Sequence, residues 1–259
     1  MRAAAGIGQP RAAERVAAAA ATSVLLAAST LTASVSHAAP SNIAGMIVFL
    51  DPGHNANNEG NSVQVPTGRG GTKDCQASGT STDDGYPEHT FTWDTTLRVR
   101  QLLTQYGVRT AMSRGDDASQ GPCVDARAAM ANSVHPNAIV SIHADGGPAT
   151  GRGFHVLYSS PPLNQVQAGP AVVLAKTVRD QMQASGLTPA TYIGSSGLMG
   201  RSDIAGLNLA QYPSVLVECG NMKNPADSAL MKTEAGRQKY AEAIVRGIAT
   251  YLVAQNRAG

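Results

Sequence analysis

The sequence predicts a single α/β domain whose mainly parallel, twisted β-sheet carries helices on both faces. Three short apolar runs predict its central strands, at residues 47–50, 138–142 and 215–217. Such runs are typical of strands buried on both faces, and they alternate here with stretches of helical periodicity. Each run leads into a residue able to bind a metal ion or carry a proton, namely His54, His143 and Glu218. Open α/β sheets keep their ligand sites at the carboxyl ends of parallel strands, so we expect these residues to lie close together.

The other elements follow from local patterns along the chain. Residues 55–86 are polar and predict a long loop, in which residues 63–65 could form a small hairpin. A helix is predicted from Pro87-Glu88 to Gly107, because Val99, Leu102, Leu103 and Tyr106 recur at helical spacing. The remaining expected elements are strands at 108–112, 138–143, 153–158, near 198 and at 214–218, and helices at 124–133, 168–185 and about 233–254.

Residues 1–38 are predicted to be a secretory signal peptide. Three arginines precede an apolar, Ala-rich run at 16–28, and Ser36-His37-Ala38 matches an A-x-A type of cleavage site. A retained membrane anchor is the alternative, but the run is shorter than the roughly 20 residues that a spanning helix needs. The 221 residues that remain suit one domain, 39–259, with a substantial core.

The charge balance argues against a nucleic-acid partner. The first 38 residues hold three Arg and one Glu, so the rest of the chain carries 17 basic and 17 acidic side chains. Nucleic-acid binding requires a concentrated positive surface, which a formally neutral domain does not predict.

Two histidines and a glutamate are candidate ligands of a catalytic metal ion. A catalytic zinc site typically has three protein ligands and keeps a fourth position for water. Glu88 could join His54 and His143, since the start of a helix favours a carboxylate. Their gaps of 34 and 55 residues match no short zinc motif, so an ordinary structural role for each His stays equally open. His155, on the strand at 153–158, is the best rival ligand.

Glu218 is a candidate proton carrier. It closes an apolar strand, where an unpaired buried charge would be costly unless the side chain faces a cleft. Near a metal ion, a glutamate that is not a ligand could take a proton from water and pass it to a leaving amine. The structural alternative is an ion pair with Arg201, Arg114 or Arg127.

Several motifs of the chain resemble those of one known family. They are Asp51-Pro52-Gly53-His54, Glu88 before the first long helix, Ser141-Ile142-His143-Ala144-Asp145, and Pro213-Ser214-Val215-Leu216-Val217-Glu218-Cys219-Gly220 with Asn224, Asp227 and Leu230 after it. From Met46 nearly to the C-terminus, the chain resembles the zinc-dependent N-acetylmuramoyl-L-alanine amidases of the amidase-3 family.

The resemblance implies a function and a role for each matched residue. Residues 39–259 would form an amidase-3 catalytic domain that cleaves the amide between N-acetylmuramic acid and L-alanine of the stem peptide. His54, Glu88 and His143 would hold one zinc ion, and Glu218 would be the catalytic base. The substrate would be peptidoglycan or its muramoyl-peptide fragments. A zinc peptidase, a carbohydrate deacetylase and a non-catalytic peptidoglycan-binding module are the rival functions.

The chain departs from the family at the rim of the expected cleft. Asn55-Ala56-Asn57-Asn58 stands where the family usually has Gly-Gly and a nearby Asp, and Asn221 stands where an aromatic residue is usual. Neither change removes a ligand or the base, so both concern peptide preference. We see no helical insertion between His143 and Glu218 of the kind that blocks the site in regulated members, and expect a site open without an activator.

The cysteines agree with secretion. Their count is three, so at least one has no partner within the chain. Cys75 and Cys123 lie in polar loops and are the expected disulfide partners in an oxidising compartment. Cys219 is expected to be a small buried residue that points away from Glu218, with a nucleophile or ligand as the alternative.

Three further expectations concern the surroundings of the site and the protein as a whole. Arg201 could bind a substrate carboxylate, although a structural pair with Asp203 is at least as well supported. His89 could support Glu88, with surface exposure as the favoured alternative. We also expect a secreted monomer in the periplasm or cell envelope, without stable membrane insertion once the leader is removed.

Overall fold

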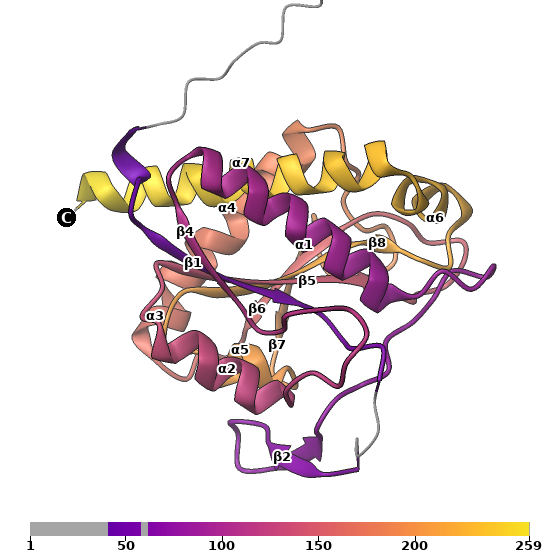
Figure 1. The fold of residues 1–259 in the computed structure, drawn as a ribbon, viewed down its shortest axis with the longest axis horizontal. Coiled ribbons are helices and arrows are strands. Elements are labelled where there is room, and N and C mark those ends of the chain that lie inside the picture. The colour runs from indigo at the N-terminus through magenta and orange to yellow at the C-terminus, as the bar shows by residue number, and fades with distance from the viewer. Residues whose placement is uncertain (1–40, 58–61, 259) are drawn as a thin grey trace, which may run out of the picture. The chain divides into compact units, whose positions relative to one another are not determined.

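A computed structural model describes residues 41–57 and 62–258, so the predicted signal peptide lies outside the described residues. Within them, six strands form one sheet in the order β4-β1-β5-β8-β6-β7 (Figure 1). The strands are β1 (Ile47–Pro52), β4 (Arg109–Met112), β5 (Ala138–Asp145), β6 (His155–Ser159), β7 (Leu198–Arg201) and β8 (Ser214–Asn221). A separate hairpin pairs β2 (Gln64–Pro66) with β3 (Thr72–Asp74), where the sequence indicated one.

The sheet is mainly parallel, as predicted, and its exception is the pairing of β6 with β8. These two strands are antiparallel, whereas the other four pairs of neighbours are parallel. A parallel return needs a crossover of a dozen or more residues, usually a helix. No helix lies between β5 and β6. The chain therefore turns at the carboxyl end of β5 and runs back, so that β6 begins at the edge where β5 and β8 end.

Helices cover both faces of this sheet (Figure 1). One face carries α1 (Glu88–Gln105), α4 (Pro170–Ala184) and α7 (Glu234–Ala258), and the other carries α2 (Val124–Ser133), α3 (Gln165–Ala168) and α5 (Ala205–Asn208). Successive side chains of a strand point to opposite faces of the sheet, so each strand packs against both layers of helices. Val140, Ile142 and Val217 belong to the large core cluster, whereas Ile139 and Leu216 belong to smaller clusters on the opposite face.

The helix expected at 168–185 is α4, which begins at Pro170, where proline suits the first helical turn. Three short α-helices among the described residues were not predicted. They are α3, which ends at Ala168 just before α4, together with α5 and α6 (Pro225–Lys232). At α6, the Asn224 side chain accepts hydrogen bonds from the N–H groups of Ala226 and Asp227.

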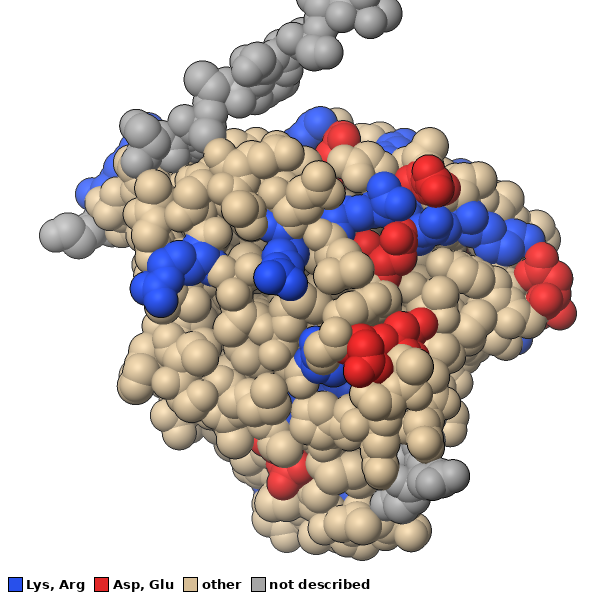
Figure 2. Space-filling view, in the orientation of Figure 1, with Lys and Arg blue, Asp and Glu red and all other residues tan. Residues whose placement is uncertain are grey.

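The described surface shows no single basic patch on the face drawn in Figure 2, where Lys and Arg lie interspersed with Asp and Glu. This agrees with the neutral balance of the domain.

Among residues 41–57 and 62–258, no helix is long and apolar enough to cross a membrane.

Candidate metal centre and active site

His54 follows β1 in a turn that fixes its ring. Its backbone has a φ of 60°, in the left-handed region that few non-glycine residues adopt. The ring Nδ1 lies 2.8 Å from the carbonyl oxygen of Ala77. A carbonyl can only accept, so Nδ1 carries a hydrogen; in the neutral ring Nε2 then presents its lone pair, and in the protonated ring Nε2 donates to Glu88. The neutral form is the tautomer in which a metal-binding histidine is typically held by its other nitrogen.

Glu88 is the first residue of α1 and is only 4% exposed. Two backbone groups anchor its carboxylate: the N–H of Thr80 donates to Oε2 at 2.9 Å, and the N–H of Ala144 donates to Oε1 at 3.0 Å. Burial raises the pKa of Glu88, but hydrogen bonds from His143 and His54 outweigh burial and lower the pKa well below its usual value. The carboxylate is therefore ionised and fixed in direction.

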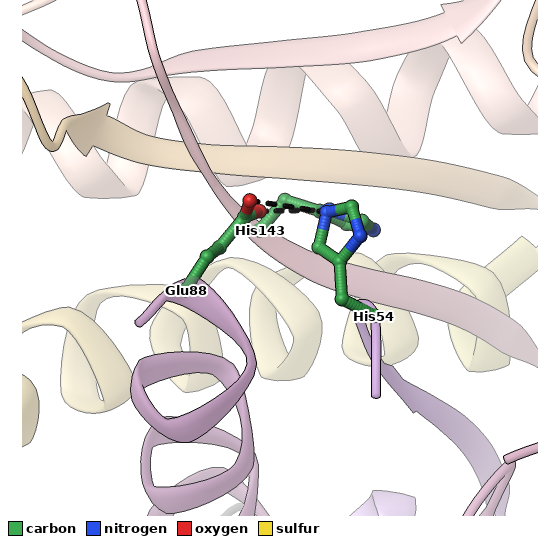
Figure 3. A group of neighbouring side chains, drawn as sticks. All are labelled: His54, Glu88 and His143. Atoms are coloured by element: carbon green, nitrogen blue, oxygen red, sulfur yellow. Dashed lines mark hydrogen bonds and ion pairs between the residues drawn. The ribbon is translucent and has the colours of Figure 1, made fainter. Parts of the chain in front are cut away.

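The ligand atoms of His54, Glu88 and His143 converge on one point (Figure 3). His54 Nε2 lies 3.1 Å from Glu88 Oε2, and His143 Nδ1 lies 3.1 Å from both Glu88 Oε1 and His54 Nε2. In a tetrahedral zinc site with bonds of about 2.0–2.1 Å, neighbouring ligand atoms would be about 3.3 Å apart. The three side chains could thus hold a metal ion with little movement.

The electrostatics of the two imidazoles also fit a cation. Burial lowers the pKa of His143, which favours the neutral ring that a metal ion requires. Burial also lowers the pKa of His54, but the hydrogen bond and charge of Glu88 raise it above its usual value. Two ring nitrogens face each other across 3.1 Å beside one carboxylate, an arrangement that a bound cation would satisfy.

Two buried arginines hold the turn that carries His54. Arg127 donates to the carbonyl oxygens of Pro52 at 2.7 Å and His54 at 3.0 Å, and to the carboxylate of Asp51 at 2.8 Å. Arg114 donates to the carbonyl oxygens of Pro52 at 3.1 Å and His89 at 2.8 Å. Arg114 therefore ties the turn of one ligand to the helix start that carries another.

Asp51, on β1, supports the same turn through its ion pair with Arg127. Burial raises its pKa, but the charge of Arg127 and hydrogen bonds from Ser113 and Ser141 outweigh burial and lower the pKa to about 2. The Asp51 carboxylate is thus charged at any pH near neutrality, and it links β1 to β5 and to the chain after β4.

Glu218 lies beside this centre on β8. It is the cross-strand neighbour of His143 on one side and of His155 on the other. Its Oε2 is buried without a hydrogen-bond partner. Burial raises the pKa of Glu218 well above its usual value, and the charges of Glu88 and Asp145 raise it further, while Arg201 lowers it. None of the ion pairs foreseen as an alternative for Glu218 forms, because Arg114 and Arg127 serve the His54 turn and Arg201 pairs with Asp203.

A cavity of about 230 Å³ adjoins these side chains. Its lining includes His54, His143 and Glu218, together with Lys73, Leu207 and Leu216. It therefore offers a polar end with metal-binding and proton-carrying groups, an apolar floor, and one lysine from the β2–β3 hairpin.

The predicted disulfide joins Cys75 to Cys123. It connects the loop whose Ala77 carbonyl holds His54 to the residue that precedes α2, the helix of Arg127. Cys219 is free and 1% exposed, on the face opposite to Glu218, as expected of a packing residue.

The other candidates occupy different places. Arg201 binds Asp203 at 2.5 Å, the structural pair that the sequence left open, and its contact with a substrate carboxylate stays a prediction. His89 is half-buried and lies 2.9 Å from the Asp117 carboxylate, so it is not a free surface residue. His155 does not belong to the group of described residues that could hold a metal ion.

Sequence reasoning did not find the arginines around the His54 turn or the place of His155 beside Glu218. The place of His155 depends on the strand order that brings β6 next to β8. The partners of Arg127 depend instead on how α2 packs beside the turn after β1.

Comparisons with a family model, with individual proteins and with solved structures each find similarity to N-acetylmuramoyl-L-alanine amidases. The family model described as Amidase_3, N-acetylmuramoyl-L-alanine amidase, matches residues 48–250. The N-acetylmuramoyl-L-alanine amidase Rv3717 of Mycobacterium tuberculosis (strain ATCC 25618 / H37Rv) is 67% identical over 236 residues, covering 91% of this chain and 98% of that protein.

Two solved structures are similar along their whole length. The N-acetylmuramyl-L-alanine amidase Ami1 from Mycobacterium smegmatis is 77% identical with a TM-score of 0.82, covering 83% of this chain and 100% of its own. The apo form of Ami1 from Mycobacterium abscessus is 67% identical with a TM-score of 0.80, covering 81% of this chain and 100% of its own.

These matches span the residues that form the site, and they favour amide hydrolysis over the peptidase, deacetylase and binding-module alternatives. The chain belongs to the Amidase_3 family and is an N-acetylmuramoyl-L-alanine amidase.

Proposed function

We propose that this amidase works with one zinc ion held by His54, Glu88 and His143, and that Glu218 is its general base and then its general acid. The observation that carries the proposal is the convergence of three ligand atoms beside Glu218 on the neighbouring strand. A ligand set of two imidazoles and one carboxylate suits zinc better than magnesium or calcium, which prefer oxygen ligands. When bound, zinc would supply Lewis acidity toward the scissile carbonyl and the attacking water.

Glu218 would move the proton. Its carboxylate accepts a proton from the water that attacks the lactyl carbonyl of the muramic acid. As the C–N bond breaks, the same carboxyl gives that proton to the departing amine nitrogen of L-alanine. The products are a lactyl carboxylate and a stem peptide with a free N-terminus. The buried position that raises the pKa of Glu218 suits the second, acidic step.

The same proposal covers the setting of the enzyme. Residues 1–38 would direct export and be removed, and residues 39–259 would act as a monomer in the cell envelope on peptidoglycan or its muramoyl-peptide fragments. The Cys75–Cys123 disulfide supports an oxidising compartment.

The first prediction tests the role of Glu218. Glu218→Ala should bind zinc as the wild type does but lose nearly all turnover, because no ligand is changed while the proton carrier is gone. The measurements are zinc content and release of the L-alanine N-terminus from a soluble muramoyl peptide.

His143→Ala is the matched control, since it should lose zinc and activity together. Removal of the metal by EDTA and its return should abolish and restore wild-type activity. Undiminished hydrolysis by Glu218→Ala would show that another group is the base.

A further inference from the structure

His143, Glu218 and His155 form a row across three neighbouring strands, β5, β8 and β6. The register pairs His143 with Glu218 and Glu218 with His155. Paired residues point to the same face of a sheet, with Cβ atoms about 4.5–5.5 Å apart. The row lies on the face of Leu216 and Leu157, whereas Val217 and Val156 point into the main core. Glu218 thus has an imidazole neighbour on each side, and only His143 belongs to the metal-binding group.

His155 is buried but its hydrogen-bonding capacity is unused. Its side chain is 2% exposed, and its Nδ1 has no hydrogen-bond partner. Its ring contacts the edge of the Tyr192 ring at a centroid distance of 6.3 Å. A buried polar atom without a partner destabilises the fold, and the neighbouring Glu218 Oε2 also lacks a partner. Two adjacent groups, one able to donate and one able to accept, are thus left unsatisfied together.

The charge state of His155 allows it to serve Glu218 without competing for the proton. Burial is the main cause that lowers the pKa of His155 to about 4. The charge of Arg201 also lowers this pKa, and the charge of Asp145 opposes both effects. The ring is therefore neutral at working pH, with one N–H donor and one acceptor nitrogen. A neutral donor can hold a carboxylate in place and still leave it free to take up a proton.

We propose that His155 is a positioning residue that donates a hydrogen bond to one carboxylate oxygen of Glu218 once substrate fills the cleft. The other oxygen then faces the attacking water. Such bonds are often absent before substrate binds and tighten in the complex, and the short distance across the strands brings this one within reach. This inference rests on the proposed role of Glu218 as the base.

The experiment compares His155→Asn with His155→Leu. The two replacements are nearly equal in size, but only asparagine keeps an N–H donor. With a muramoyl peptide as substrate, His155→Leu should lower kcat about ten- to a hundredfold, as expected for the loss of a hydrogen bond to a charged group, and leave KM within about twofold. His155→Asn should recover most of that loss. Zinc content should stay unchanged in both.

Two controls separate positioning from packing. Val156→Ala removes buried volume from the same strand on the opposite face, so it should lower the melting temperature but not kcat. If His155 only fills space, leucine should preserve kcat as well as asparagine does, and the proposal is overturned.

A double-mutant cycle separates this inference from the function on which it rests. In a Glu218→Asp background, where the shortened carboxylate no longer reaches its place, His155→Leu should cost less than about twofold further. Full additivity would overturn positioning through Glu218. Normal activity of Glu218→Ala would instead overturn the role of the base itself.

Discussion

Gly53 determines whether the His143 ring can occupy the metal centre. A Cβ atom at this position would lie 2.3–2.5 Å from three atoms of that ring, far inside any real contact. The backbone of Gly53 is not in the left-handed region, so alanine could adopt it without strain. The glycine is therefore required by the approach of the imidazole.

Gly53→Ala should consequently leave the fold intact but displace a ligand. We expect the zinc affinity to fall about ten- to a hundredfold, as it does when the support of a ligand is removed, with a stability cost of about 1–3 kcal/mol. Competition with a chromogenic chelator measures the affinity. Gly115→Ala, where no atom lies within 4 Å, should change neither quantity. Unaltered zinc binding in Gly53→Ala would mean that the ring can move aside freely.

Asp51 gives the protein a pH-dependent contribution to stability. Its pKa is about 2 in the folded chain and about 3.9 in an unfolded one. A depressed pKa stabilises the fold fully above the unfolded value, and this stabilisation is lost as the pH falls through the folded value. The contribution is about 2 kcal/mol and should disappear between roughly pH 5 and pH 2.

Asp51→Asn should flatten the stability curve in that window. Urea denaturation at pH 5 and at pH 2.5 should differ by less in the variant than in the wild type, by about 1–2 kcal/mol. Asp180→Asn, which alters an exposed carboxylate paired with Arg179, should leave the difference as it is. Equal acid sensitivity of Asp51→Asn and wild type would contradict the role of Arg127, Ser113 and Ser141 around this carboxylate.

At the level of single residues, sequence reasoning succeeded where a residue lies toward the carboxyl end of its own strand. His143 and Glu218 follow apolar runs, so their place at one sheet edge could be predicted without coordinates. Arg127 could not be assigned in this way. It lies within α2, and the carbonyl groups that it holds become its partners only when that helix packs beside the β1 turn.

Among the elements, those with a periodic pattern were predicted well and those defined by their contacts were not. Helix α2 was expected at 124–133 and spans Val124–Ser133. Helix α5 has only four residues, too few for any periodicity, and its place depends on its contacts with α2 and the sheet. The antiparallel direction of β6 could not be predicted from its own residues either, because it depends on the connection between β5 and β6, which contains no helix.

The disulfide joins two elements that position the site, and this leads to a prediction about both. Cys75 and Cys123 are separated by 48 residues, so the bond should stabilise the fold by about 4 kcal/mol in the chain-entropy model. Cys75→Ala/Cys123→Ala should lower the melting temperature by about 10 °C and weaken zinc binding. The reason for the second effect is that the loop with Ala77 would no longer be tied to the start of α2.

Calorimetry with and without a reducing agent checks this. Reduction should shift the wild type and Cys219→Ala alike, because Cys219 is free and buried, and should have no effect on the double variant. A double variant that melts with the wild type would show that the hairpin region is held by its other contacts alone.

In the molecule as a whole, the metal centre connects segments that the chain keeps far apart. His54 lies in the turn after β1, Glu88 begins α1 and His143 lies on β5, so the centre joins the sheet to the helical layer at one point. The sequence could predict this only through the family motifs, since spacing alone left each histidine undecided. A ligand that binds the folded chain and not the unfolded one stabilises the fold by mass action.

Zinc should therefore stabilise the whole domain. At a free concentration a thousandfold above its dissociation constant, the gain is about 4 kcal/mol, which corresponds to a rise in melting temperature of about 10 °C over the EDTA-treated protein. Magnesium at the same concentration should give no such rise, because two of the three ligands are imidazoles. Glu218→Ala should keep the full rise, since Glu218 is not a ligand, and His143→Ala should lose it. If His143→Ala is stabilised as strongly as the wild type, zinc acts at some other part of the chain, and the His54–Glu88–His143 centre does not bind it.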